Sequence, residues 1–403
     1  MLSAFVIYLL LAGAMVATFV EPFVGLVTWY VLSFLRPQDI YWYAFRDDRL
    51  SLYCAIAVLL ALVPGRVLRG ERPVVFTATT GAIAGLWAWA IVSSLVSDYP
   101  QPSLVTLQAL SKVLLFCILA AGLASTEARL RVTIWTIVLS LGILAIRGNL
   151  EYFLDGKPRI EGPGAAAGIA AALTDRNLFA MHLVMAVPLA AFLLLSERKP
   201  LVRAGLIGLI AFLVHAVLLT FSRGGLIGLA VVAGYVVWRV RSPRLRLAAL
   251  VACLVLVALF AGPPVRATLD SIVNYDRDAS AQSRFGSWQA GLSLMWSYPV
   301  FGVGLSNFER YSARFDPTGG GPLGGHAAHN AFLQIGGDLG LPGLAFYVAV
   351  LACAFANLRR ARRLLRGVDA PFARRCGAMA SGLEGALAGF VVCGMFLSLE
   401  LLE

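Results

Sequence analysis

Two of the chain's four histidines, His326 and His329, follow a glycine-rich stretch and stand where polar loop gives way to a long apolar run. A neutral imidazole at this position is a suitable general base, because histidine titrates near neutral pH. His329 and Asn330 begin a predicted helix, whose free backbone amides and dipole would favour an anion. An alternative is that His329 only solvates the helix end. The residues predict proton removal beside a negatively charged group, with His329 as the base and His326 as an accessory residue.

Five arginines are predicted at the same ends of apolar runs as the histidines: Arg147, Arg159, Arg176, Arg223 and Arg284. Arg223 lies between two apolar runs with almost no loop around it, so its guanidinium must stay near the membrane boundary. The planar guanidinium binds phosphate oxygens in pairs, which suits a lipid-linked phosphate or pyrophosphate. For any single arginine, snorkelling to the interface is the alternative. As a set they predict an anion-binding site.

A metal site is the competing interpretation of these residues. His326 and His329 are three residues apart and could share a metal with an outer acid such as Asp276. Two acidic pairs, Asp47-Asp48 and Asp276-Arg277-Asp278, could hold a divalent ion on a glycosyl phosphate, although solvated loop is the better interpretation of both. The glycines before His326 argue against an early helix start. We therefore predict no metal and no cofactor.

The composition identifies the class of protein that carries these residues. The 403 residues are 59% hydrophobic and 14% charged, with a mean hydropathy of +0.80, which is typical of a polytopic membrane protein. The first apolar segment has no basic residue before it and no small-residue cleavage site, so we expect it to remain as an anchor. The six cysteines have no paired spacing, which argues against a disulfide framework. No ATPase, zincin or serine-hydrolase motif is present.

The apolar runs predict an all-α fold with 11 or 12 membrane helices. Residues 1–35 are ambiguous, because Glu21-Pro22 could divide them into two short helices. The remaining runs lie near residues 51–69, 74–96, 103–123, 131–153, 177–196, 202–221, 224–240, 246–262, 330–357 and 376–402. We therefore expect three parts: membrane helices over 1–262, a loop region with short helices over 263–329, and membrane helices over 330–403.

The charges of alternate loops predict the orientation. Loops at 65–72, 124–131, 196–203, 239–246 and 358–375 carry 19 basic and four acidic residues, so they should face the cytoplasm. The opposite loops carry 13 residues of each sign and should face outward. The formal charge of +11 therefore belongs to the inner membrane surface and its anionic lipids, and it does not indicate nucleic acid.

The outward region contains a predicted helix around "SRFGSWQAGLSLMW", followed by the glycine-rich "DPTGGGPLGGH". Such a segment beside a membrane is typical of a lid or a substrate-binding loop, and a simple tether is the alternative. Asp338 lies within the next membrane helix and must therefore have a partner or a polar cavity. His182 and His215 lie inside apolar runs and are expected to be buried and hydrogen-bonded.

Three stretches resemble a known family: "TFSRGGLIGLAVV" from Thr220, "SRFGSWQAGLSLMWSYPVFGVGLSNFERY" from Ser283 and "HNAFLQIGGDLGLPGLAFY" from His329. The arginine followed by Trp288, the turn at residues 299–304 and the His-Asn helix start are specific as an ordered set. They resemble the O-antigen ligase and polymerase superfamily of bacterial envelope glycosyltransferases, particularly ligases of the WaaL type. The stretch "LSFLRPQDIYWYAF" resembles the ligase branch associated with exosortase systems.

The resemblance implies a GT-C-like membrane glycosyltransferase of the bacterial inner membrane, with its active site on the periplasmic side. Its donor would be a glycan on undecaprenyl pyrophosphate, and its acceptor a sugar hydroxyl of lipid A-core. Transfer would invert the anomeric centre without metal or nucleotide. His329 matches the family's essential histidine, and Arg223 and Arg284 match its arginines. Asp175-Arg176-Asn177 departs from the family's Asn-Pro-Asn, so Arg176 is matched less well than Asn177.

Three other functions remain open at this point. A polymerase of the same superfamily would use a second lipid-linked glycan as acceptor, and a protein O-glycosylation ligase would use a protein. A lipid-linked glycan flippase would also have many helices and cavity arginines. A transporter, however, is expected to show polar midplane residues and internal repeats, neither of which the sequence contains.

Overall fold

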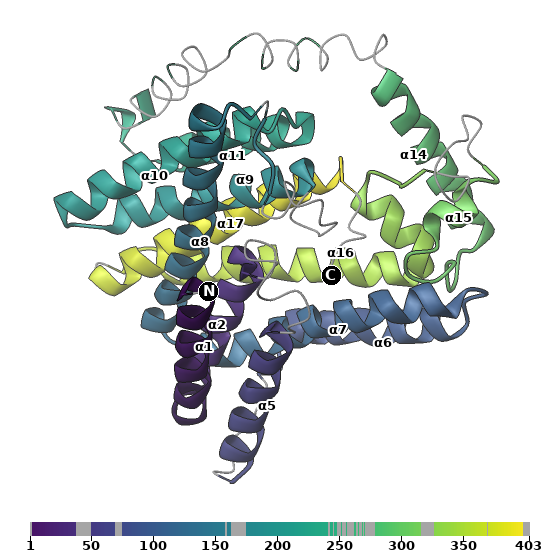
Figure 1. The fold of residues 1–403 in the computed structure, drawn as a ribbon, viewed down its shortest axis with the longest axis horizontal. Coiled ribbons are helices and arrows are strands. Elements are labelled where there is room, and N and C mark those ends of the chain that lie inside the picture. The colour runs from purple at the N-terminus through teal and green to yellow at the C-terminus, as the bar shows by residue number, and fades with distance from the viewer. Residues whose placement is uncertain are drawn as a thin grey trace.

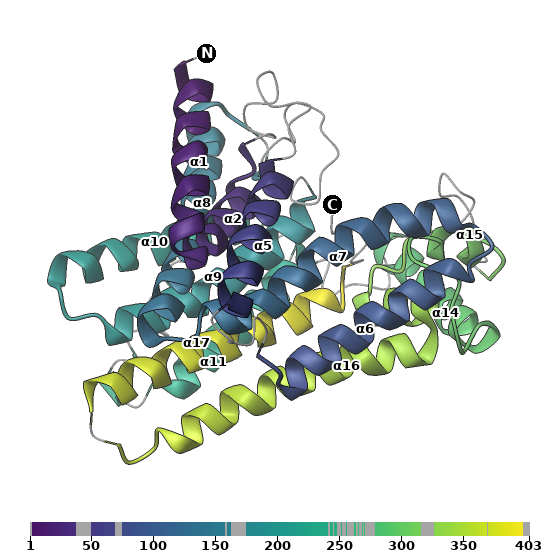
Figure 2. The ribbon, with the colours of Figure 1, turned by 90° about the horizontal axis from the view of Figure 1, so that it is seen from below.

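The computed structural model describes residues 2–37, 50–68, 75–157, 159–162, 175–240, 279–315, 326–368 and 370–397, with isolated positions between 242 and 270. Within these residues every regular element is a helix (Figures 1 and 2). Seven of the described helices are long and apolar enough to cross a membrane, and three more apolar helices are shorter. The predicted all-α membrane fold is confirmed, while most of the predicted 246–262 span lies outside the described residues.

Residues 2–35 form two helices, α1 (Leu2–Val20) and α2 (Pro22–Leu35), which settles the ambiguity of the sequence. Glu21 separates them, and its carboxylate accepts a hydrogen bond from the Phe23 amide at 3.2 Å. Pro22 then occupies the first position of α2, where its missing N–H costs nothing. Arg129 pairs with the same carboxylate at 2.6 Å, so the turn is fixed to the start of α8 (Glu127–Leu154).

The buried centre of the molecule is α9 (Arg176–Ser196), which is the most buried of the candidate spans. It packs between α11 (Arg223–Arg239) and α17 (Pro371–Gly394) through glycines. A Cβ at Gly385 would lie 2.8 Å from Pro188 Cβ, and one at Gly225 would lie 2.8 Å from Ala180 Cβ. Small residues let membrane helices approach closely, because lipid supplies little hydrophobic driving force between them. The "RGGLIGLA" stretch is therefore a packing surface of α11.

A break near the start of α16 (Ala331–Leu364) forms a second packing centre. Gly340 has φ +70° and interrupts the helix, and the 299–307 turn lies against the break. Leu341 N donates to Pro299 O at 2.8 Å, and Gly304 N donates to Asp338 O at 2.8 Å. Gly302 has φ +67°, and a Cβ there would lie 2.4 Å from the Asp338 carbonyl oxygen. The turn thus needs glycine both for its backbone conformation and for its close approach.

Side chains of α6 (Ala78–Leu95) and of the turn between α6 and α7 (Pro100–Leu123) bind carbonyl groups of the break and of the 299–307 turn. Trp89 Nε1 donates to Leu339 O at 2.7 Å, Ser93 Oγ to Phe301 O at 2.7 Å, and Ser97 Oγ to Val303 O at 2.6 Å. Irregular backbone at membrane depth is stable only when protein covers and satisfies it. The pair α6 and α7 therefore supports the turn.

Asp338 has the partners that the sequence required. Its carboxylate accepts hydrogen bonds from Phe308 N at 3.1 Å and Gln334 Nε2 at 3.0 Å, and from Ser306 N at 3.4 Å. The residue is 4% exposed. Asp338 thus fixes the turn and the short helix α15 (Phe308–Ser312) to α16. In both views, α14 (Ala279–Ser297) and α15 lie at the ends of α6, α7 and α16 (Figures 1 and 2).

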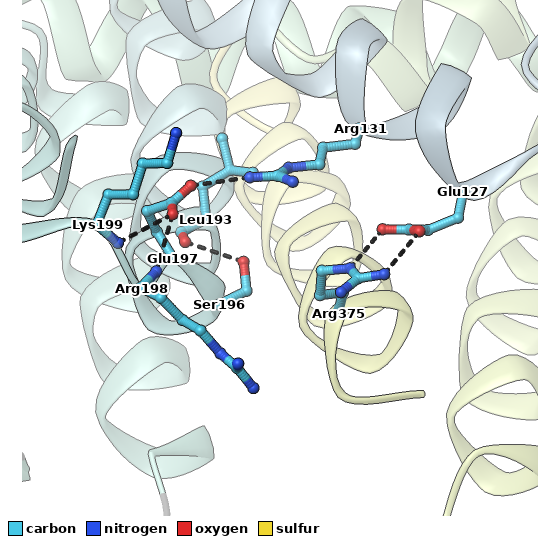
Figure 3. Close-up of polar contacts among 8 residues, drawn as sticks. All are labelled: Glu127, Arg131, Leu193, Ser196, Glu197, Arg198, Lys199 and Arg375. Atoms are coloured by element: carbon cyan, nitrogen blue, oxygen red, sulfur yellow. Dashed lines mark hydrogen bonds and ion pairs between the residues drawn. The ribbon is translucent and has the colours of Figure 1, made fainter. Parts of the chain in front are cut away.

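Ion pairs join the loops that the charge count assigns to one face. Glu127 binds Arg375 through two contacts of 2.7 and 3.0 Å, which connect the starts of α8 and α17. Glu197, just after α9, binds Arg131 at 2.8 Å (Figure 3). The turn before α11 lies at the other end of α9, where Ser222 contacts Asn177. The remaining described helices are α5 (Leu50–Leu68) and α10 (Pro200–Leu219).

Candidate active site

Three helices, α9, α11 and α16, begin close together at the end of the molecule opposite the Glu127–Arg375 pair. Ser222, before α11, donates to Asn177 Oδ1 in the first turn of α9 at 2.8 Å. A Cβ at Gly394, where α17 ends, would lie 3.6 Å from Ala331 Cβ, where α16 begins. The N-terminal ends of three helix dipoles therefore meet here, and this favours a bound anion.

Each of the three helix starts is capped by a side chain. Asp175 accepts from the amides of residues 177 and 178, Ser222 from that of residue 225, and Asn330 from those of residues 332 and 333. This differs from the expectation of free amides at the start of α16, because Asn330 Oδ1 occupies two of them. Direct anion binding must therefore come mainly from side chains, with the dipoles adding a favourable field.

His329 directly precedes the cap residue of α16 and has an unusual backbone conformation. Its φ is +45°, in the left-handed region that residues other than glycine rarely adopt. Phe221 has φ +52° and holds the same position before Ser222, the cap of α11. The side chain of His329 is exposed. Strained residues cluster at functional sites, and the observed strain at an exposed histidine therefore supports a functional role.

The electrostatic surroundings of His329 favour its neutral form. The pKa of His329 is lowered from the ordinary value of 6.5, first by partial desolvation and then by the positive charge of Arg284. His326 lowers it further, while the negative charge of Asp175 opposes the shift. The imidazole is consequently unprotonated near pH 7 and able to accept a proton. Arg284 and Asp175 come from two other segments, so tertiary structure brings them to His329, whereas His326 lies three residues before it.

The helix α14 places Arg284 and Trp288 toward the start of α16. Gly291 and Met295, further along the same helical stripe, contact Leu333 and Gly336 of α16. Residues four apart share a helix face, so Arg284 and Trp288 continue this stripe toward His329. The indole Nε1 of Trp288 is buried and has no hydrogen-bond partner among the described residues. Its ring meets Phe285 edge to face at 5.6 Å.

Arg176, the first residue of α9, joins the second half of the site. Its charge interacts with those of Arg159, Asp175, Arg223 and Glu161. The segment carrying Arg159 is held by a hydrogen bond from Ile160 N to Leu219 O at 3.0 Å, just before α11. Arg159 also pairs with Glu161 at 2.6 Å. With Arg284, which acts on His329, the described part of the site holds four arginines and the two carboxylates of Asp175 and Glu161.

The other two predicted residues, Arg147 and His326, interact mainly with groups close to them. Arg147 pairs with Glu151 on its own helix at 2.7 Å, and Lys157 shares that carboxylate, so the charge of Arg147 is already balanced. The His326 carbonyl accepts a hydrogen bond from Ser312 Oγ at 3.1 Å. Burial raises the pKa of Glu309, and the positive charge of His326 opposes this shift. His326 therefore lies between His329 and α15.

Sequence reasoning missed the part that Asp175 plays. The sequence identified Asp175 only as part of a departure from the family's Asn-Pro-Asn pattern. In the structure, Asp175 caps α9 and lies within electrostatic range of His329. An acidic residue directly before an apolar run is a known N-cap signal and could have identified it. The described residues contain no group of three potential metal-binding side chains. Both acidic pairs, Asp47-Asp48 and Asp276-Arg277-Asp278, lie outside the described residues.

Comparison with known families adds the decisive observation. Residues 208–348 match the O-antigen ligase family. Residues 208–348 therefore form a region of the O-antigen ligase superfamily. Residues 1–194 match a second family, whose function is unknown. A search of curated proteins found no match to the chain.

The two matched regions both contribute residues to the candidate site. His329, Arg223 and Arg284 lie in the ligase region, whereas Asp175, Arg176 and Arg159 lie in the region of unknown function. The resemblance proposed from sequence began near residue 170, and the ligase match begins later, at residue 208. The assignment to the WaaL type and to the exosortase-associated branch stays a prediction.

Proposed function

We propose that the protein is an O-antigen ligase that transfers a glycan from undecaprenyl pyrophosphate to a sugar hydroxyl of lipid A-core. Membership of the superfamily supports glycosyl transfer in general. The observation that carries the specific proposal is the proximity of His329 to Arg284 and Asp175, which joins a neutral base to an arginine-rich anion site. Such a combination suits a reaction in which a hydroxyl loses a proton and a pyrophosphate leaves.

The proposed reaction has one substitution step. The acceptor oxygen attacks the anomeric carbon of the donor glycan from the side opposite the pyrophosphate, which inverts the configuration. The bond from that carbon to the pyrophosphate oxygen breaks, and Arg176, Arg223 and Arg284 stabilise the departing negative charge. His329 takes the hydroxyl proton. Trp288 supplies an apolar ring and an unpartnered N–H donor for the glycan.

Three further residues support this arrangement in the proposal. Asn330 orients His329 by capping the helix that follows it. His326 tunes the charge around His329 and is accessory. Arg159 adds positive charge near Arg176, where it is partly balanced by Glu161. Arg147 was predicted with the same set, but its pairing with Glu151 makes it the weakest candidate for substrate binding.

A transfer assay with purified protein tests the proposal. The full chain in detergent would receive an undecaprenyl pyrophosphate-linked glycan and lipid A-core, and the product would be separated by mass. We expect one glycan on lipid A-core and release of undecaprenyl pyrophosphate. Elongation of a second lipid-linked glycan would identify a polymerase instead, and transfer only to protein would identify a protein ligase. Movement of the donor across vesicles without any product would indicate a flippase.

Removal of metal ions distinguishes a histidine that acts as a base from a histidine that binds a metal. Exhaustive EDTA treatment should leave transfer unchanged, because arginines supply the positive charge for the leaving group. Loss of transfer that one specific divalent ion restores would assign His326 and His329 to a metal site.

The proposal places the site at the periplasmic face of the bacterial inner membrane. This side follows from the basic residues of the opposite loops. In a background without the native cysteines, a cysteine at position 320 should react with an impermeant reagent added outside, and one at 367 should not. The reverse pattern would contradict the orientation.

A further inference from the structure

A second cluster of arginines lies at the opposite ends of α11 and α16 from the candidate active site. Its centre is Glu384 of α17, which is 5% exposed. The Glu384 carboxylate accepts hydrogen bonds from Tyr235 Oη at 2.6 Å and Arg362 Nη2 at 2.5 Å, and from Arg359 Nε at 3.3 Å. Arg239, the last residue of α11, donates from Nη2 to Ser381 Oγ at 3.2 Å. The cluster therefore joins α11, α16 and α17.

The charges and donors of this cluster are not balanced. Two arginines, Arg359 and Arg362, share the single carboxylate of Glu384, and the partner of Arg239 is a neutral hydroxyl. Three buried donors, Arg239 Nε and the Nε and Nη1 of Arg362, have no hydrogen-bond partner among the described residues. The Arg362 side chain is only 14% exposed. Buried charged donors require an acceptor, and an anion would supply both the acceptor and the missing negative charge.

The position of the cluster indicates which anion it would meet. Arg223 and Arg239 are the first and last residues of α11, and at 1.5 Å per residue they lie about 24 Å apart, close to the thickness of a membrane's hydrocarbon core. The Arg239 guanidinium lies 5.9 Å from the ring centre of Tyr235 and 5.6 Å from that of Trp238. Trp238 is 69% exposed. Exposed tryptophan beside tyrosine and arginine is typical of the level of lipid headgroups.

We propose that Arg239 and Arg362 bind the phosphodiester of an anionic phospholipid in the leaflet opposite the candidate active site. The unpartnered N–H groups would donate to the phosphate oxygens, and the exposed face of Trp238 would contact the glycerol and upper acyl chains. Basic pockets between membrane helices at the cytoplasmic side bind anionic headgroups in this way. A soluble phosphate shares the chemistry of the headgroup but would gain nothing from Trp238. The site is separate from the proposed glycan transfer.

Native mass spectrometry of the full chain in detergent tests this proposal. The protein would be titrated with phosphatidylglycerol and, separately, with phosphatidylcholine of the same acyl chains. We expect phosphatidylglycerol to bind at least about fivefold more tightly, since a basic residue near anionic lipid contributes about 1 kcal/mol. Arg239→Gln and Arg362→Gln should each remove most of this preference. Arg363→Gln is the matched control, because this exposed arginine is adjacent in sequence and lies outside the cluster.

Two variants keep the test decisive. Arg362→Gln leaves Glu384 without its closest cation, so the double variant Arg362→Gln/Glu384→Gln replaces the pair by neutral hydrogen-bonding groups. Arg239 does not contact Glu384, so Arg239→Gln tests the site independently. Equal binding of both lipids, or equal loss of preference in Arg363→Gln, would overturn the proposal. Full displacement of the lipid by millimolar inorganic phosphate would also overturn it, in favour of a soluble anion.

Discussion

The two polar regions around the start of α16 use buried and charged groups in opposite ways. Asp338 is buried, and its carboxylate accepts hydrogen bonds from neighbouring amides, so that its charge is stabilised within the protein. His329 lies nine positions earlier, is exposed and strained, and interacts with the charges of Arg284 and Asp175 from two other segments. One region fixes the backbone, whereas the other keeps an excess of positive charge at the surface.

This difference separates structural from functional polarity. A buried carboxylate that is fully hydrogen-bonded contributes to the fold, and its removal should disturb packing. The arginines beside the neutral histidine can bind the charge of an anion when it arrives. The α6–α7 pair and the 299–307 turn belong to the first kind of region, and Arg176, Arg223 and Arg284 to the second.

The largest expected effect is the loss of transfer in His329→Ala. Removal of the imidazole should slow transfer about a hundredfold or more, the usual range for a general base. The thermal midpoint should change little, because His329 is exposed. His329→Asn is the matched variant, since asparagine tolerates a positive φ but cannot act as this base. His326→Ala should be milder than either.

Asp338→Asn should affect stability more than transfer, which is the opposite of the result expected for His329→Ala. An asparagine places an N–H₂ group where the carboxylate now accepts hydrogen bonds, and leaving such a donor or acceptor unsatisfied costs about 1–3 kcal/mol. We expect a lower thermal midpoint and a lower yield in the membrane, with transfer by the remaining folded protein largely retained. A stable Asp338→Asn with no activity would show that the two regions do not have separate roles.

An intermediate effect is expected for Arg223→Lys and Arg284→Lys. Lysine keeps the charge but loses the paired donors, and a charge-assisted hydrogen bond contributes about 1.5–3 kcal/mol. Transfer should fall roughly tenfold to a hundredfold, with the protein still present in the membrane. Full activity in both variants would show that guanidinium geometry is not used.

The smallest effect is expected for Arg147→Gln, which serves as the control for the other arginines. Its charge is already paired with Glu151, and exposed ion pairs contribute about 0–1 kcal/mol. Transfer should stay within about twofold of the native protein. A loss as large as that of Arg284→Lys would place Arg147 in the anion site after all.

The sequence predicted the helices well, because each long apolar run can satisfy its backbone only as a helix in lipid. The observed bounds of α9, α10 and α11 fall within two residues of the predicted runs. Glu21-Pro22 was identified as a break, although its outcome as two helices needed the pairing with Arg129. The helix around Trp288 was also predicted correctly.

The tertiary part of the site could not be predicted in the same way. Asp175 and His329 are far apart in sequence, and only the packing of α9, α11 and α17 through glycines brings them into electrostatic range. The break at Gly340 was equally hidden, because its partners on α6 lie about 250 positions away. Local patterns identify residue types, whereas these contacts depend on which helices are neighbours.

The dependence of transfer on pH tests most directly whether His329 is the base of an arginine-rich site. Values of kcat/KM report the pKa of the free protein's essential base. For the native chain, activity should fall on the acid side only below the ordinary histidine pKa of 6.5. Arg284→Gln removes a charge that lowers this pKa, so the fall should move to higher pH. Asp175→Asn keeps a good helix cap but removes a charge that raises the pKa, so the fall should move to lower pH. Shifts in opposite directions are the predicted result, and three identical profiles, or two shifts in the same direction, would contradict the assignment of His329.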